Sequence, residues 1–337
     1  MSTAVRRPNQ ADIAAELGVS ISTVSRALAN EAGISESVRL DVQRVARALG
    51  YRSKHLAASV SLARRAVALV PLGSATSGIS GFYVGIVEGM RAEAANSGMH
   101  LDVRLINESM ITLDFIKQML GQLQADSILL AGIDPWDDLT DWCKEAGIKV
   151  ILVNGVDPLM RFSSVAPANF YGGYMATKRL IDAGHRRILH YTHGKLRPTI
   201  LQRKRGFEAA IADNPDVEGI IVNSEDYSTS QLLHEIVAGT HGATALFSWN
   251  DIAAIEMIEG LHGEDLRLPP NFSIIGFDDL PLASMTSPRL STIRVDREAM
   301  GRAAIRLLHE SMDEETSVRH LQIGLSLVPG GTVYQVG

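Results

Sequence analysis

The chain has 337 residues, enough for two or three domains with a core in each, and no apolar run approaches the ~18 residues that a membrane span requires. Cys143 is the only cysteine, so an intrachain disulfide is excluded and a reducing, cytoplasmic location is expected. The formal net charge of −6 argues against nucleic-acid binding when the chain is taken as a whole.

The charge is unevenly divided along the chain. Residues 1–65 carry a net charge of +5, whereas the remaining 272 residues carry −11. A basic segment attached to an acidic body is typical of a protein in which one module contacts phosphates while the rest avoids them. The N-terminal segment is therefore the candidate nucleic-acid-binding module.

Residues 9–30 have the pattern of a helix-turn-helix. The first helix has one apolar stripe, Gly18 allows a tight turn, and Ser20 is a suitable N-cap for the second helix. An ordinary helical hairpin is the alternative, but the turn, the small residues at the crossing and a polar outer face together favour DNA binding. That outer face has short or hydrogen-bonding side chains and one arginine able to reach a guanine edge or a phosphate: Ile21, Ser22, Ser25 and Arg26.

A third helix is expected over residues 35–50, where it completes a small helical core within residues 1–50. Residues 51–65 are expected to form a hinge and linker. The Ala- and Ser-rich part of this segment is too short to be a stable helix alone. It is therefore either a flexible linker or a helix that folds beside a partner copy on DNA.

From residue 66 to residue 337, apolar strand-like runs alternate with amphipathic helical patterns in two successive series. Continuous apolar strands joined by helices predict parallel sheets covered on both faces. The fold expected is thus an all-α head followed by a two-lobed α/β core of two doubly wound subdomains. We place the first lobe at about 66–183 and 292–316, and the second at about 184–291 and 317–333. A ligand of this core would lie between the lobes, beyond the carboxyl ends of the strands.

The sequence has no catalytic signature that the core would explain. It contains neither a G-x-S-x-G motif nor a phosphate-binding loop. His190 and His193 lie three residues apart on a predicted strand, so their side chains should face opposite sides and not converge on a metal. We therefore expect no enzyme activity, metal or cofactor. A set of acids at a predicted helix start is expected to cap that helix: Asp134, Asp137 and Asp138.

Short motifs also follow one another along the chain: the helix-turn-helix, Gly50-Tyr51-Arg52, Gly89, GGYMATKRLIDAGHRRI, Arg203 with Gly206-Phe207, FSWND, LPPNFSIIGFDD and Met300-Gly301. On these motifs the chain resembles, from about residue 10 to about residue 332, the LacI/GalR (lactose and galactose repressor) family of transcription regulators. The resemblance implies a periplasmic-binding-protein-like core and a homodimer or higher oligomer. It also implies a repressor that binds a pseudo-palindromic operator in double-stranded DNA near the nucleoid and senses a small effector.

The resemblance further implies a set of DNA contacts. Residues of the second helix would read bases or contact phosphates, the hinge entry would add two residues, and one hinge side chain would wedge into the minor groove. The residues at these positions are Ile21, Ser22, Thr23, Ser25, Arg26, Tyr51, Arg52 and Val60. Val60 stands where the family usually has the longer leucine.

The resemblance places the effector beside a second set of residues: Phe82, Tyr83, Arg203, Asn250 and Asp278. Asn250 and Asp278 each follow a predicted strand, and a carboxylate, an amide and a guanidinium together suit sugar hydroxyls. Phe82 and Trp249 could stack on the apolar face of a sugar. The alternatives are structural, with Asp278 capping a turn and Arg203 pairing on a helix surface.

Several ligands and one other class of protein suit this core. A monosaccharide, a sugar acid, a nucleoside and a phosphosugar would each find partners, and the effector could release or strengthen DNA binding. A solute-binding protein of the transport type shares the two-lobed core and is the alternative function. It predicts a secretory signal and no helix-turn-helix, and the sequence has the opposite of both.

Overall fold

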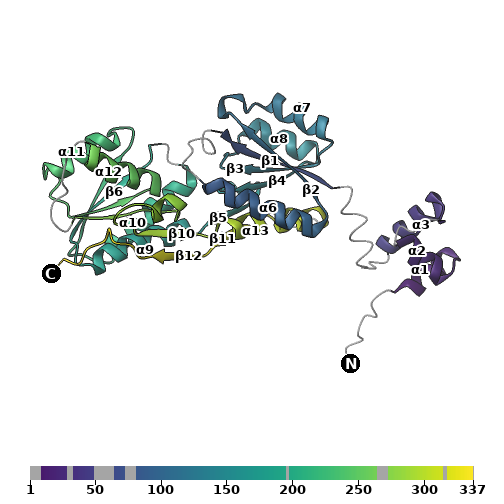
Figure 1. The fold of residues 1–337 in the computed structure, drawn as a ribbon. Helices are drawn as coiled ribbons and strands as arrows, with labels where there is room; N and C mark the ends of the chain where they lie inside the picture. The colour runs from purple at the N-terminus through teal and green to yellow at the C-terminus, as the bar shows by residue number, and fades with distance from the viewer. Residues whose placement is uncertain are drawn as a thin grey trace. The chain divides into compact units, whose positions relative to one another are not determined.

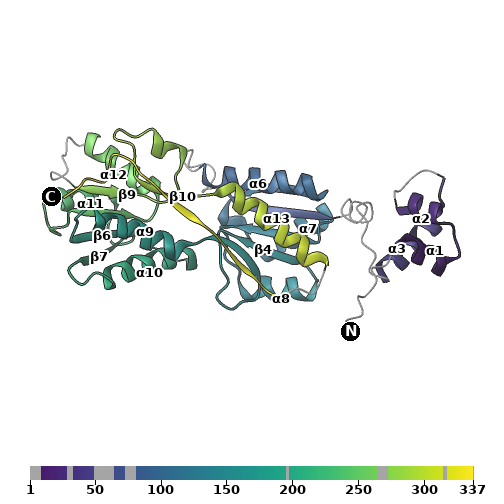
Figure 2. The same ribbon diagram turned by 90° about the horizontal axis from the view of Figure 1, so that it is seen from below.

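The computed structural model describes residues 9–28, 33–48, 64–72, 81–194, 197–263, 272–313 and 317–336. The chain divides into two units, one of residues 1–66 with 94–101 and one of residues 67–93 with 102–337. The expected hinge at 51–65 lies almost entirely outside the described residues. Figures 1 and 2 show the helical head and the two-lobed α/β core from two directions.

The described residues of the head form three helices, as predicted: α1 (Gln10–Leu17), α2 (Ile21–Leu28) and α3 (Glu36–Ala48). Gly18 ends α1 in the left-handed region at a φ of 64°, and this conformation makes the tight turn. The Ser20 hydroxyl accepts a hydrogen bond from the Thr23 amide at 3.0 Å, so Ser20 caps α2. The apolar stripes of the three helices meet in one core: Ile13, Ala14, Val24, Ala27, Leu28, Val42, Val45 and Ala46.

The first lobe of the core is a six-stranded sheet in the order β11-β5-β4-β3-β1-β2. Strands β3, β4, β5 and β11 pair in parallel. Helices α7 and α8 cover one face and α6 and α13 cover the other (Figures 1 and 2). The bounds are β1 (Arg65–Pro71), α6 (Phe82–Ser97), β2 (His100–Ile106), η1 (Glu108–Met110), α7 (Leu113–Leu123), β3 (Ser127–Ala131), α8 (Asp137–Glu145), β4 (Lys149–Val153), β5 (Ser163–Pro167), α13 (Arg297–Asp313) and β11 (His320–Ile323).

The second lobe is a parallel sheet in the order β7-β6-β8-β9. Apolar side chains of α11 and α12 pack on one face of this sheet. On the other face, the His190 ring stacks on Phe207 of α10 and on Phe247. The bounds are α9 (Asn169–Asp182), β6 (Arg187–Thr192), α10 (Pro198–Ala212), β7 (Glu218–Asn223), α11 (Thr229–Val237), β8 (Ala245–Ser248), α12 (Asp251–Gly263), β9 (Ser273–Ile275) and η2 (Pro281–Ser284).

Among the described residues, three connections join the two lobes: β5 to α9, β10 (Thr292–Val295) to α13, and β11 to β12 (Leu325–Val328). Strands β10 and β12 pair antiparallel and form a two-stranded ribbon. The crossings place these elements beside one another although they are distant in sequence.

The lobe boundaries differ from those expected in two places. Helix α9 was expected in the first lobe, but it packs on α10 of the second. Glycines allow this close packing, because a Cβ at Gly173 would lie 2.1 Å from the Arg203 carbonyl oxygen. Strand β11 was expected in the second lobe, but it pairs with β5 and extends the first sheet.

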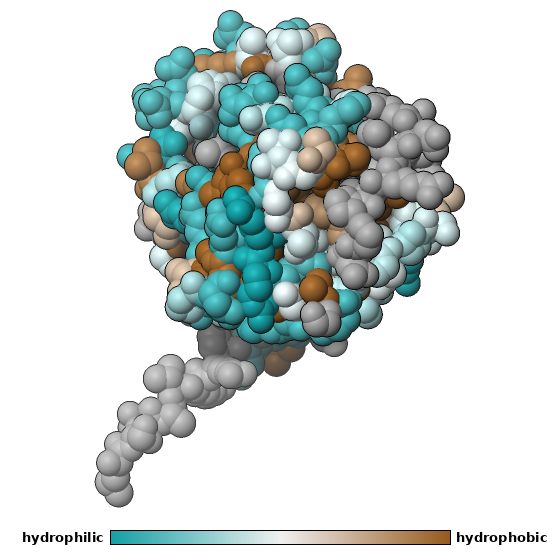
Figure 3. All heavy atoms as spheres, turned by 90° about the vertical axis from the view of Figure 1, so that its left-hand side faces the viewer, coloured by the Kyte–Doolittle hydropathy of each residue, from teal (hydrophilic) through white to brown (hydrophobic). Residues whose placement is uncertain are grey.

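Within the described residues, no helix combines the length and the apolar character that a bilayer crossing needs. The end of the second lobe, shown in Figure 3, is mostly hydrophilic, and hydrophobic side chains lie there in separate patches.

Candidate functional site

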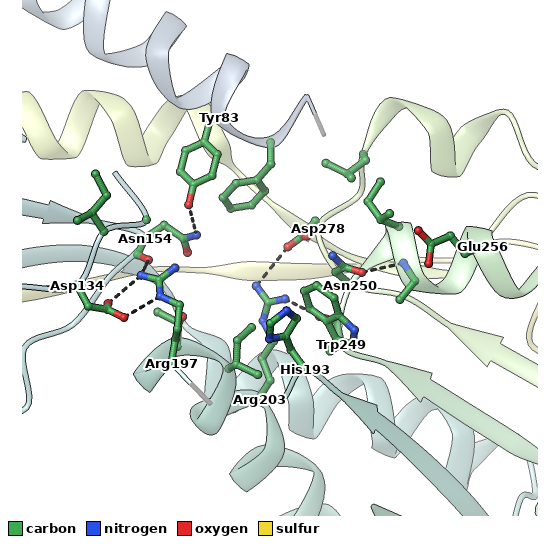
Figure 4. Close-up of a pocket in the computed structure, with 18 of the residues that line it drawn as sticks. Tyr83, Asp134, Asn154, His193, Arg197, Arg203, Trp249, Asn250, Glu256 and Asp278 are labelled. Atoms are coloured by element: carbon green, nitrogen blue, oxygen red, sulfur yellow. Dashed lines mark hydrogen bonds and ion pairs between the residues drawn. The ribbon is translucent and has the colours of Figure 1, made fainter. Parts of the chain in front are cut away.

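A cavity of about 990 Å³ lies between the two lobes, at the carboxyl ends of their parallel strands (Figure 4). Side chains from both lobes line it, and they include all six residues that the sequence places beside an effector. The polar and aromatic lining residues are Phe82, Tyr83, Asp134, Trp136, Asn154, His193, Arg197, Thr199, Arg203, Trp249, Asn250, Glu256 and Asp278.

Arg203 makes three side-chain hydrogen bonds at the cavity. Its Nε donates to Asn169 Oδ1 at 2.8 Å, its Nη1 to the Trp249 carbonyl oxygen at 2.6 Å, and its Nη2 to Asp278 Oδ1 at 3.2 Å. The guanidinium also lies 3.7 Å from the centre of the Phe277 ring. Burial lowers the pKa of Arg203, and Asp278 opposes this shift. The alternative of a surface pair on a helix is therefore wrong.

Asp278 directs its carboxylate at Arg203 from a backbone with a φ of 114°, outside the usual range of a non-glycine residue. Burial raises its pKa to about 6, although Arg203 and Arg297 lower it. The neighbouring Asp279 points elsewhere and pairs with Arg294 at 2.6 Å. Asp251, rather than Asp278, accepts the Leu280 amide of the following turn. Asp278 is thus a nearly buried, titratable group in the wall of the cavity.

Asn250 and Trp249 follow β8 and lie on the second-lobe side of the cavity (Figure 4). Asn250 Oδ1 accepts from the Ala253 amide at 2.8 Å, which fixes the side chain at the start of α12. The Trp249 ring meets His193 edge-on at 4.7 Å. Its buried Nε1 has no hydrogen-bond partner in the described part of the chain. A ligand could supply that partner.

The first-lobe wall begins with Phe82 and Tyr83, whose rings pack edge to face at 5.3 Å. The Tyr83 hydroxyl accepts from Asn154 Nδ2 at 3.1 Å, and burial raises the pKa of Tyr83. Gly132 makes room for this hydroxyl, because a Cβ there would lie 1.9 Å from it. Asn154 Oδ1 is buried and has no partner among the described residues.

Asn154 was not predicted as a site residue. It directly follows β4, so its position at the carboxyl end of a strand, which Asn250 and Asp278 share, was the available signal.

Asp134 was predicted to cap a helix, and this prediction is wrong. The N-cap of α8 is Trp136, which makes no side-chain capping bond. Asp134 instead accepts two hydrogen bonds from Arg197, from Nε to Oδ2 and from Nη2 to Oδ1, both at 2.8 Å. Asp134 follows the first-lobe strand β3 and Arg197 precedes α10, so this pair bridges the cleft (Figure 4).

The two histidines considered as metal ligands have different surroundings, and only His190 lies on β6. His190 is buried, donates from Nδ1 to the Phe247 carbonyl oxygen at 3.0 Å, and has a pKa that burial lowers to about 4. His193 lies at the cavity. The described residues contain no group of three or more His, Cys, Asp or Glu side chains able to hold a metal ion.

The outer face of α2 is accessible. Ile21 is 53% exposed, and Ser22, Ser25 and Arg26 are exposed as well. The hydroxyl of Thr23 is 2.8 Å from that of Ser20. The hinge residues of the predicted DNA contacts lie outside the described residues: Tyr51, Arg52 and Val60.

Two family models match the two parts of the chain. Residues 11–54 match bacterial regulatory proteins of the lacI family, and residues 177–333 match a periplasmic binding protein-like domain. The chain thus combines a helix-turn-helix domain of the lacI family with a periplasmic-binding-protein-like core. It is a DNA-binding transcriptional regulator with a helix-turn-helix and a two-lobed core, as the sequence predicts.

Named regulators match this chain over most of its length. It is 25% identical to the transcriptional repressor PurR of Photobacterium profundum over 92% of this chain and 93% of that one. It is 26% identical to the regulator CelR of Thermobifida fusca (93% and 94%) and 28% identical to the ribose operon repressor of Haemophilus influenzae (88% and 90%). These relatives are regulators, so the prediction that the chain is not an enzyme is confirmed.

Solved structures of two transcription regulators resemble this chain. A complex of the regulator CelR with cellobiose matches with a TM-score of 0.69 and 25% identity, over 97% of this chain and 100% of that one. The regulator CcpA of Lactococcus lactis has a TM-score of 0.69 and 19% identity, over 80% of this chain and 99% of that one, and therefore shares the fold.

Proposed function

We propose that this regulator is a homodimeric repressor whose affinity for a pseudo-palindromic DNA operator is controlled by a carbohydrate in the cleft. One observation supports the effector part of this proposal: the six predicted residues come from four separate places in the sequence and line one cavity between the lobes. The cavity also presents aromatic rings and two buried polar atoms that have no partner among the described residues, Trp249 Nε1 and Asn154 Oδ1. Rings beside hydrogen-bonding groups are what a sugar needs.

The DNA half of the proposal assigns the exposed face of α2 to the major groove. Ile21, Ser22 and Arg26 would contact base edges, while Thr23 and Ser25 would contact phosphates. Tyr51 and Arg52 would contact DNA at the hinge entry, and Val60 would enter the minor groove. The head, hinge and core would occupy residues 1–50, 51–65 and 66–337. The protein would act in the cytoplasm, where the nucleoid supplies its operator.

The ligands in the names of two relatives support a sugar as the effector. One relative is a ribose operon repressor and one solved structure is a CelR–cellobiose complex. Binding between the lobes would change the angle between them and so alter how two heads of a dimer meet the operator. A coupling of about 1–3 kcal/mol between the two sites would be sufficient.

The test uses the full-length chain. Operator sites are first selected from random duplex DNA by binding to the protein. Retention of the selected DNA by the protein is then measured at several salt concentrations. It is measured again with each sugar that raises the melting temperature of the protein. We expect sequence-selective retention that weakens steeply with salt and changes with one sugar. Retention that is unselective or insensitive to salt would contradict the DNA half. Sugar binding without any DNA binding would favour the solute-binding alternative.

A further inference from the structure

The charges of the cleft are compensated within the protein. Among the described lining residues, three carry carboxylates, Asp134, Glu256 and Asp278, and two carry guanidinium groups, Arg197 and Arg203. Both guanidinium groups already pair with a carboxylate of the cleft. The described lining therefore presents no excess of positive charge to a ligand.

The Arg197–Asp134 pair has the geometry that an anionic ligand would otherwise use. The Nε and Nη2 edge of Arg197 meets both carboxylate oxygens of Asp134 in a two-pronged arrangement. This is the arrangement in which a guanidinium recognises a carboxylate or a phosphate. Asp134 thus occupies the edge of Arg197 with a carboxylate of the protein itself.

The second guanidinium is no better placed to receive an anion. Arg203 donates to Asn169, to the Trp249 carbonyl oxygen and to Asp278, and it is only 4% exposed. A ligand anion beside it would also approach the Asp278 carboxylate. An anion that loses its hydration without gaining a paired cation is strongly disfavoured.

Two polar groups of the cavity have no hydrogen-bond partner among the described residues, and both are uncharged. Trp249 Nε1 is a donor and Asn154 Oδ1 is an acceptor, and both are buried at the cavity without a hydrogen bond in the described structure. They lie on opposite walls, one in each lobe (Figure 4). Hydroxyl groups can satisfy both, since a hydroxyl donates and accepts.

We propose that the cleft takes an uncharged polyhydroxyl ligand, and that Asp134 determines this specificity by occupying Arg197 and so excluding sugar acids and phosphosugars. This inference rests on the proposed effector site and narrows its ligand class. Asp134 would thus determine which ligands are excluded, although other residues would make the main contacts to the bound ligand. Removing its charge while keeping its shape should open an anion site at Arg197.

The experiment compares the full-length wild type with Asp134→Asn and with Asp138→Asn. Asp138 lies close by, is exposed, and does not line the cavity, so it is a matched loss of one negative charge. The probes are inorganic phosphate and three sets: glucose with glucuronate and glucose 6-phosphate, ribose with ribose 5-phosphate, and cellobiose with cellobionate. Melting shifts and calorimetric dissociation constants are measured at equal ionic strength.

We expect the wild type and Asp138→Asn to reject the anionic probes, and Asp134→Asn to bind at least one of them about tenfold more tightly. The double variant Asp134→Asn/Arg197→Gln should lose this gain. Asp134→Ser provides a second route to the same result if the asparagine variant folds poorly.

Two results would overturn the inference: a wild type that binds an anionic sugar at least as tightly as its neutral counterpart, or no anion gain in either Asp134 variant. The inorganic phosphate arm needs no knowledge of the natural ligand. The proposed function fails separately, if no sugar of either charge alters operator retention by the wild type.

Discussion

The two guanidinium–carboxylate pairs of the cleft have the same chemistry but different surroundings. Arg203 and Asp278 are nearly buried, with side chains 5% and 10% exposed, whereas Arg197 and Asp134 are 29% and 36% exposed. Water can replace the partner of an exposed group but not that of a buried one. The buried pair, Arg203 with Asp278, is therefore part of the architecture of the second lobe, and we call it the inner pair. The more exposed pair, Arg197 with Asp134, is the outer pair, and it joins the two lobes with hydrogen bonds that water can readily replace.

Replacing Arg203 should have the largest effect on stability. Arg203→Ala removes three hydrogen bonds and leaves the Asp278 carboxylate buried without its cation. We expect the free energy of unfolding to fall by about 3–5 kcal/mol, as measured by urea denaturation. A loss below 1 kcal/mol would show that the inner pair is no more structural than the outer one.

The second-largest effect should be on the pH dependence of the unfolding free energy, through the titration of Asp278 in the inner pair. Burial raises the pKa of Asp278 to about 6 in the folded state, above its unfolded value of about 3.9. The folded state then holds more protons between these values, so the contribution of Asp278 to stability falls as pH rises from about 4 to about 6. We expect a decrease of about 2–3 kcal/mol in the wild type relative to Asp278→Asn, measured by denaturation at each pH. Parallel profiles for the two proteins would contradict the raised pKa.

An arginine away from the cleft sharpens the comparison. Arg26 lies on the exposed face of α2 and does not line the cavity, so Arg26→Ala should leave sugar binding unchanged. Specific operator binding should weaken by about 1–3 kcal/mol, measured by titration of labelled operator. Ser37→Ala, an exposed change in α3, is the control. Unchanged operator specificity in Arg26→Ala would remove Arg26 from the base-reading set.

The outer pair should show the smallest effect on stability. Arg197→Gln breaks two hydrogen bonds to a half-exposed carboxylate, so the unfolding free energy should change by about 1 kcal/mol or less. The same urea titration as for Arg203→Ala measures it. A loss as large as that of Arg203→Ala would mean that the bridge across the cleft supports the fold.

The sequence predicts one wall of the cleft better than the other. The family resemblance indicates Asn250 and Asp278, and their positions after apolar strands support that indication. Asp134 follows a strand in the same way, but Pro135 and two further acids made helix capping the simpler interpretation. Its actual partner, Arg197, is 63 residues away, and local patterns carry no information about such a pair.

Local patterns also cannot show which lobe an element joins, and this explains why α9 and β11 were expected in the wrong lobes. The pattern predicts a helix over residues 172–184 but does not say which sheet the helix covers. The adjacent glycines Gly172 and Gly173 were the available signal, because they allow α9 to approach its neighbours closely. The helix-turn-helix was fully predictable, since its turn, cap and core all lie within a short stretch of sequence.

The hydrogen bond from Arg203 to position 249 reaches the main chain and not the indole ring. The backbone at that point is therefore anchored whatever side chain it bears, and the ring is free to differ without loosening the anchor. Exchange of Trp249 for a smaller or more polar residue would reshape the chamber while the scaffold behind it stays in place. New ligand preferences could thus arise at this position one substitution at a time.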